Sequence, residues 1–170
     1  NKGCKMRKNI INLMLWLLAV TLFSLSLFSS KVYAEDVKKY CNPRYGFCVS
    51  YLEEFGIEPA SQNGDGRKFY TNDDFKMTIF GSNGVSGTAE NIAKSYTEGI
   101  TALTYKQSGK NWYALSGYKG DNVLYIKVYS GKGSFNCIII EYPKGTKNEN
   151  DQLVSHIVKS FKPGNTNIPH

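Results

Sequence analysis

Few side chains in this sequence have the chemistry of a nucleophile or a strong metal ligand. His156 and His170 are the only two histidines, and a histidine-rich zinc site needs more ligands of this kind. Cys137 lies in a continuous apolar run, which predicts a buried thiol rather than a reactive one. The sequence has no Gly-x-Ser-x-Gly motif followed by an acid and a histidine. We therefore predict no catalytic residue and no zinc site.

Side chains that carry oxygen are more frequent, and Asn63, Asp65, Asp73 and Asp74 have the hard ligand atoms that calcium requires. Their spacing matches no calcium-binding loop, and asparagine, glycine and aspartate are the usual residues of tight turns. Adjacent carboxylates such as Asp73 and Asp74 point to opposite faces of a strand, so they are poor pairs for glycoside hydrolysis. The sequence predicts no bound metal and no cofactor.

Tyrosine is the residue type that most favours a binding function, because the chain after residue 34 is rich in it: eleven of the twelve tyrosines lie there. In the stretch 122–129, Leu124, Ile126 and Val128 alternate with Tyr125, Lys127 and Tyr129, which predicts a strand with one core face and one amphipathic face. Tyrosines on a sheet face that no helix covers would suit a protein, peptide or glycan partner. The alternative is ordinary β-propensity with buried rings. The candidate ligand-binding residues are Tyr105, Tyr113, Tyr118, Tyr125 and Tyr129.

Three cysteines follow residue 34, which leaves room for one disulfide and one free thiol. Cys41 and Cys48 flank a segment in which Pro43 and Gly46 suit the ends of a turn. Counting outward from this turn places Cys41 opposite Cys48 in a hairpin, close enough for a bridge. A bridge between Cys48 and Cys137 on neighbouring strands is the alternative, and the sequence leaves both pairings open.

The first 34 residues have the three zones of a secretory signal peptide: a basic start, an apolar run over 10–28 and the exit Val32-Tyr33-Ala34. Met6 is a plausible start of the natural chain. We expect cleavage after Ala34, which places the mature protein in a periplasm or outside the cell. The alternative is an uncleaved membrane anchor, and it is the only membrane association that the sequence predicts.

The formal charge of +7 is concentrated in this leader, which holds five of the 21 basic residues and none of the 14 acidic ones. The remaining chain has 16 basic and 14 acidic residues, a formal charge of +2. Nucleic-acid binding draws on clustered contacts between basic side chains and phosphates. We therefore expect no nucleic-acid partner.

The elements that must position these residues follow from periodicity and turn signals. We predict one mature domain over 35–163, followed by a disordered tail over 164–170. Its two helices carry apolar stripes at 89–100 and 153–161. Loops are predicted at 58–66 and 81–87. Strands are predicted in a hairpin around residues 41–48 and at 67–71, 75–80, 102–107, 111–118, 122–129 and 134–142. This order predicts an α+β domain with a mainly antiparallel β-sheet flanked by two or more helices.

Several short segments resemble those of small exported bacterial domains of the PsbP-like class. They are Tyr40-x-Asn42-x-x-Tyr45-Gly46-Phe47-x-Val49-x-Tyr51, Asn63-Gly64-Asp65-Gly66, Tyr142-Pro143 and Ser160-Phe161-x-Pro163. The resemblance implies an antiparallel sheet between helices, an α/β/α sandwich that this class shares with a eukaryotic Ran-binding protein. Leu52 follows Tyr51 where such sequences tend to have proline. The matching segments are turns, strand ends and a helix stop, so they imply a fold and carry over no functional residue.

The hypothesis that fits these observations is a non-catalytic binding or accessory module outside the cytoplasm. One alternative is a secreted hydrolase whose site assembles from scattered acids and tyrosines. A second alternative is an inhibitor or immunity-type protein that binds an enzyme through the loops at 58–66 or 81–87.

Overall fold

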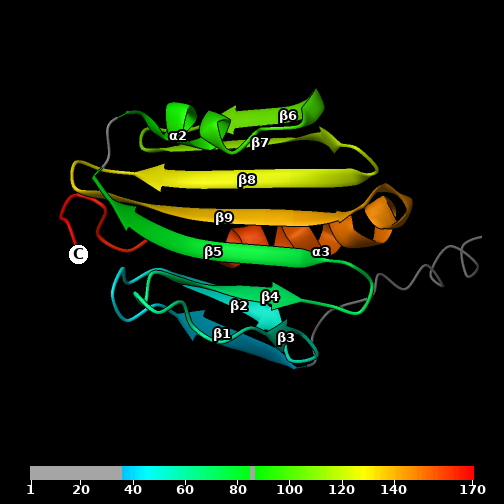
Figure 1. The fold of residues 1–170 in the computed structure, drawn as a ribbon, viewed down its shortest axis with the longest axis horizontal. Helices are drawn as coiled ribbons and strands as arrows, with labels where there is room; N and C mark the ends of the chain where they lie inside the picture. The colour runs from blue at the N-terminus through cyan, green and yellow to red at the C-terminus, as the bar shows by residue number, and fades with distance from the viewer. Residues whose placement is uncertain (1–35, 85–86) are drawn as a thin grey trace, which may run out of the picture. The chain divides into compact units, whose positions relative to one another are not determined.

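Seven antiparallel strands form the main sheet of the computed structural model, which describes residues 36–84 and 87–170 (Figure 1). The predicted leader, residues 1–34, lies outside the described residues. In spatial order the strands are β3 (Gly56–Ile57), β4 (Gly66–Tyr70), β5 (Lys76–Asn83), β9 (Ser134–Pro143), β8 (Asn122–Ser130), β7 (Trp112–Lys119) and β6 (Ile100–Ser108). A separate two-stranded sheet pairs β1 (Val37–Cys41) with β2 (Cys48–Leu52).

The two faces of the main sheet are covered by different elements. In Figure 1, helix α2 (Ala89–Ser95) lies in front of the sheet, and helix α3 (Lys147–Ser160) lies behind β9 and β5. A single 3₁₀ turn, η1 (Lys144–Thr146), leads from β9 into α3. The hairpin β1–β2 shares the α3 side, because α3 contacts β2 and the ring of Phe47 meets that of Phe161 at 6.4 Å. The predicted α+β class, with a mainly antiparallel sheet flanked by helices, is confirmed.

Alternation along the strands produces one apolar core on each side of the sheet. On the α2 side, Ala93 packs over Leu115 and Ile126 of the neighbouring strands β7 and β8. On the α3 side, Ile138 and Ile157 are fully buried. Both faces of β9 are therefore in the interior, as the continuous apolar run around Cys137 predicts.

Helix α2 is shorter than the apolar stripe at 89–100 predicts. Thr88 caps its start by accepting a hydrogen bond from the Asn91 N–H at 3.3 Å. The helix ends at Ser95, and Gly99 then adopts a positive φ of 80°, which allows the chain to turn directly into β6. Ile100 therefore begins a strand, although it still packs against the same core as Ala93.

The two predicted loops have different outcomes. Residues 58–65 form no helix or strand, as predicted. The predicted loop at 81–87 is wrong at its start, since β5 continues to Asn83 and pairs it with Ser134 of β9. Pairing with a long neighbouring strand keeps the polar residues of this segment extended.

The disulfide joins Cys41 to Cys48, with the two Cα atoms 4.1 Å apart across the first hairpin. The Asn42 side chain organises the turn, because its Oδ1 accepts hydrogen bonds from the backbone N–H groups of Arg44 and Tyr45 at 2.9 and 2.7 Å. Cys137 is free and fully buried on β9. The alternative bridge between Cys48 and Cys137 is therefore not formed.

The prediction of a disordered tail at 164–170 is wrong. The Thr166 carbonyl accepts a hydrogen bond from the Ser134 N–H at 3.0 Å, and Thr166 itself is buried. The Gly164 N–H donates to Oδ1 of Asn136, a side chain with no solvent exposure, at 2.9 Å. The Ser134 N–H and the Asn136 amide at the start of β9 thus find partners in the tail, and sequence periodicity carries no sign of this contact.

We expect removal of residues 165–170 to destabilise the domain by about 1–3 kcal/mol, because it leaves the buried Ser134 N–H and the neighbouring Gly133 N–H without their acceptor, the Thr166 carbonyl. Urea unfolding, followed by circular dichroism, measures this loss. Asn167→Ala, at an exposed tail position, is the control and should leave the midpoint unchanged. A truncated domain as stable as the complete one would mean that the tail does not pack.

We also expect the double substitution of Cys41 and Cys48 by serine to lower the free energy of unfolding by about 2–3 kcal/mol, because the bridge closes a short loop in the unfolded chain. Reduction of the wild-type protein should cause a similar loss. Equal stability of the oxidised wild-type protein and the serine variant would contradict this expectation.

Candidate functional site

A groove of about 550 Å³ opens on the α3 side of the main sheet. Its floor comes from the three strands β6, β7 and β8, and its wall is the side of α3 that carries Asp151, Val154 and Val158. Helix α3 packs against β9 and β2 through Leu153, Val154 and Ile157. One helix is about 10 Å wide and neighbouring strands are about 4.8 Å apart, so α3 does not extend over the β6 edge. The groove occupies this uncovered part of the sheet.

The floor of the groove is aromatic. Tyr105 of β6 and Tyr125 of β8 stack with ring centroids 6.3 Å apart and an interplanar angle of 27°. Ser116 of β7 lies between them, since it pairs with Tyr105 on one side and with Tyr125 on the other. Trp112 lies four residues from Ser116 along β7, on the same face. The floor therefore combines the aromatic rings of Tyr105, Trp112 and Tyr125 with phenol hydroxyl groups and an indole N–H.

Only two of the five candidate tyrosines, Tyr105 and Tyr125, line the groove. Tyr113 points to the opposite face and is buried in the core beneath α2. Tyr118 and Tyr129 have the same strand parity as the floor. They are half-buried and do not line the groove. The five therefore do not form one continuous surface, because the strand parity of Tyr113 differs from that of the others.

The rings of Tyr118 and Tyr129 are occupied by contacts within the domain. The ammonium group of Lys144 lies 4.6 Å from the ring centroid of Tyr118. The ring of Tyr129 meets the buried ring of Phe161 at 5.5 Å, almost edge to face. The packing of Tyr129 therefore agrees with the alternative interpretation, in which a tyrosine occurs on a strand because of its β-propensity and packs its ring within the domain.

Trp112 and Lys127 also line the groove, although the tyrosine pattern of the sequence does not single them out. The Lys127 ammonium lies 4.8 Å from the Trp112 ring centroid and 5.1 Å from that of Tyr129. Such cation–π contacts hold the charge above the floor. The alternation in 122–129 already places Lys127 on the same face as Tyr125, and the pairing of Trp112 with Tyr129 adds the tryptophan.

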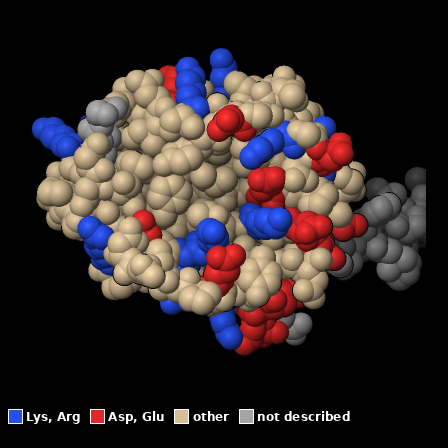
Figure 2. Space-filling view, viewed as in Figure 1, with Lys and Arg blue, Asp and Glu red and all other residues tan. Residues whose placement is uncertain are grey.

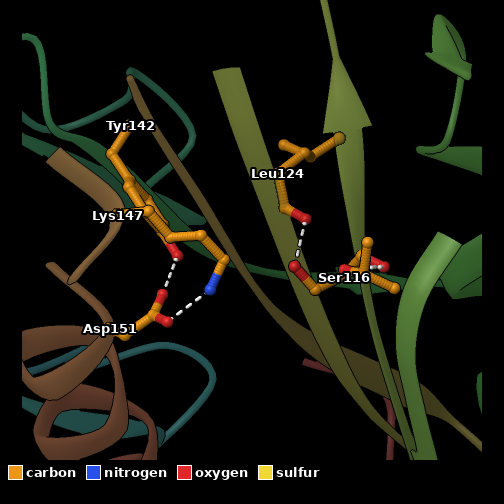
Figure 3. Close-up of polar contacts among 6 residues, drawn as sticks. Ser116, Leu124, Tyr142, Lys147 and Asp151 are labelled. Atoms are coloured by element: carbon orange, nitrogen blue, oxygen red, sulfur yellow. Dashed lines mark hydrogen bonds and ion pairs between the residues drawn. The ribbon is translucent and has the colours of Figure 1, made fainter. Parts of the chain in front are cut away.

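The helical wall of the groove carries a polar cluster. The Tyr142 hydroxyl donates a hydrogen bond to Asp151 Oδ1 at 2.7 Å, and Lys147 forms an ion pair with the same carboxylate. Figure 3 shows this cluster on one side and Ser116 on the other, where the Ser116 hydroxyl donates to the Leu124 carbonyl at 2.9 Å. The wall and the floor therefore both present polar groups to the space between them.

Two of the phenols that line the groove, those of Tyr125 and Tyr142, have a raised pKa and remain neutral at physiological pH. Burial raises the pKa of Tyr125, with a smaller contribution from the nearby tyrosines. Burial also raises the pKa of Tyr142, and its hydrogen bond to Asp151 adds to the effect. Neutral phenols act as hydrogen-bonding and stacking groups. The charges that line the groove are Lys127, Lys147 and Lys159 against the single carboxylate of Asp151, so its net formal charge is positive.

The other side chains considered as reactive groups do not gather at the groove. Burial raises the pKa of the Cys137 thiol, which solvent does not reach. His156 is exposed on α3, and the ring of His170 packs 5.1 Å from that of Tyr45. Within residues 36–84 and 87–170, no three His, Cys, Asp or Glu side chains are close enough together to hold a metal ion.

The opposite side of the sheet carries mixed charges. Figure 2 shows this side, where acidic and basic side chains are interspersed toward the right of the view. A hollow of about 600 Å³ lies there, and Lys68, Lys76 and Glu141 are among its lining residues. The hollow lacks the stacked aromatic rings of the groove, so the groove is the stronger candidate for a binding site.

None of the helices in the described part of the chain has the length and apolar character needed to cross a membrane.

No protein-family model matches the sequence, and no curated protein matches it. The fold is similar to the solution structure of cyanobacterial PsbP (CyanoP) from Synechocystis sp. PCC 6803, with a TM-score of 0.58 over 81% of this chain and 99% of that chain. The two sequences are 12% identical, a level at which the likeness concerns the fold alone. The resemblance noted in the sequence is thus confirmed for the fold: the described residues have a PsbP-like α+β fold.

Proposed function

We propose that this domain is a non-catalytic binding module that acts outside the cytoplasm and holds its ligand in the groove between α3 and the strands β6–β8. The observation that carries the proposal is the convergence of Tyr105, Trp112 and Tyr125 on a part of the sheet that α3 leaves uncovered. Aromatic rings with polar groups beside them are typical of binding sites.

The polar groups of the groove support binding rather than catalysis. A hydrolase that uses two carboxylates needs both of them at the scissile bond. Asp151 is the single carboxylate among the described lining residues, and Lys147 and Tyr142 already engage it. General acid–base chemistry also favours groups with a pKa near the working pH, and burial shifts the phenol of Tyr125 away from that range.

Two features support a location outside the cytoplasm. The first 34 residues have the zones of a cleaved signal peptide. The mature domain contains the Cys41–Cys48 disulfide, and such bonds persist in oxidising compartments. The proposal therefore places the domain in a periplasm or in the extracellular medium.

The groove favours a ligand that combines apolar surface with negative charge. The stacked rings of Tyr105 and Tyr125 offer a flat contact area. The lysines of the groove outnumber its carboxylate, which attracts anions and disfavours cationic ligands. Acidic peptides and acidic glycans both have this combination.

Trp112 supplies a direct test, because it is the only tryptophan after residue 34. We expect acidic peptides or acidic oligosaccharides that bind the mature domain to change the fluorescence of Trp112. Tyr125→Ala should weaken this binding about tenfold, since it removes an aromatic contact at the centre of the floor.

The matched control is Tyr70→Ala, which removes an exposed tyrosine from the opposite side of the sheet, and it should leave affinity unchanged. If Tyr125→Ala leaves the affinity unchanged and the bound ligand leaves Trp112 fluorescence constant, the binding site lies elsewhere. Turnover of these ligands, measured by mass spectrometry of the products, would show that the module is a hydrolase.

A further inference from the structure

Strand β6 is an open edge beside the groove. It is the last strand of the seven-stranded sheet, and Figure 1 shows it at the top of the view, beyond β7. Every residue from Thr101 to Ser108 is exposed, and no other strand in the described part of the chain pairs with the outer side of β6. An unpaired edge of this kind is a template for an added strand.

The hairpin between β6 and β7 shows which backbone groups are free. The Gly109 N–H donates to the Trp112 carbonyl at 3.0 Å and closes the hairpin. In an antiparallel ladder, hydrogen-bonded and non-hydrogen-bonded pairs alternate. Counting back from Gly109, Ser108 and Lys106 fall in non-hydrogen-bonded pairs with β7. Their N–H and C=O groups therefore point outward, to the position of an additional strand.

The pairing of β6 with β7 is regular only in the second half of β6. The pairing of β6 with β7 has register shifts near Ile100 and Leu103 and is continuous from Tyr105 to Ser108. Bulges interrupt the row of backbone groups that an added strand needs. Strand addition is therefore confined to the segment that borders the groove.

Side-chain alternation connects the edge to the groove. Tyr105 and Gln107 point into the groove, and the Tyr105 hydroxyl donates to Gln107 Oε1 at 2.6 Å. A strand added to β6 continues this pleat, so every second side chain of the added strand enters the groove. These side chains would approach the ammonium groups of Lys127 and Lys159.

We propose that the ligand of the groove is an extended polypeptide segment that adds to the edge of β6 and places acidic side chains at alternate positions into the groove. The inference rests on the proposed function, because it assumes that the groove is the ligand site. Charge complementarity supports it, since Asp151 is already engaged by Lys147 while Lys127 and Lys159 have no carboxylate partner among the described residues. The repeating N–H and C=O groups of a peptide match the outward groups of Lys106 and Ser108, whereas an oligosaccharide has no such repeat.

The test uses a capped peptide of alternating glutamate and valine, about seven residues long so that it spans an average strand. A lysine–valine peptide of the same length and an acidic oligosaccharide serve as comparison ligands. We expect the glutamate peptide to change Trp112 fluorescence, to bind more weakly as salt increases and to protect the Lys106 and Ser108 amides from hydrogen exchange. The lysine peptide should bind at least about tenfold more weakly.

Two variants at one position separate backbone pairing from charge. Lys106→Pro removes an outward N–H that makes no bond to β7, whereas Lys106→Ala removes the charge and keeps the N–H. We expect the proline variant to bind the glutamate peptide about tenfold more weakly than the alanine variant. Circular dichroism shows whether the proline variant is folded. If it is not, Ser108→Pro and the amide exchange of the wild-type protein provide the same test.

The outcomes distinguish this inference from the proposed function. If the glutamate peptide changes Trp112 fluorescence without protecting the Lys106 and Ser108 amides, or if only the acidic oligosaccharide changes this fluorescence, the groove is a binding site but strand addition is wrong. Equal binding of the lysine and glutamate peptides overturns the acidic specificity. If none of these ligands changes Trp112 fluorescence, both the inference and the proposed function fail.

Discussion

Burial of both faces of β9 is the constraint on which the rest of the domain depends. Cys137 on one face and Ile138 on the other are fully buried. Each face therefore needs a cover, and the chain supplies α2 on one side and α3 with the β1–β2 hairpin on the other. Neighbouring strands extend the sheet outward from this central strand, and burial decreases toward the edge strand β6.

The groove is a consequence of this arrangement. Helix α3 lies where its apolar stripe finds apolar partners, over β9 and against β2. The strands β6–β8 extend beyond α3. On the side of the sheet that faces α3, their residues are more polar than the apolar residues of β9 beneath the helix. Tyr105, Trp112, Ser116 and Lys127 combine apolar rings and stems with polar ends, so they tolerate contact with water where a face of leucine or valine would not. The sheet can therefore stay partly uncovered on this side without exposing a purely apolar surface.

Two buried asparagine side chains fix the ends of the domain through hydrogen bonds to the backbone. Asn42 organises the turn of the first hairpin, and Asn136 binds the backbone of Gly164 from within the interior. A buried amide is costly unless it is hydrogen-bonded. These two residues thus tie the β1–β2 hairpin and residues 164–170 to particular positions. The tail belongs to the folded domain for this reason, although its composition is that of a flexible segment.

Local patterns along the chain are enough to predict several features of this domain. Alternation predicted the strands and placed Tyr125 and Lys127 on one face, turn chemistry placed Cys41 opposite Cys48, and the order of elements predicted the α+β class. Packing between distant parts of the chain places Tyr113 beneath α2 and brings Tyr105 and Tyr125 together at a groove. The same kind of packing places residues 164–170 on the start of β9. The physical reason is that periodicity shows which residues of one element share a face, whereas the position of α3 and the contacts of the tail depend on packing between residues far apart in the chain.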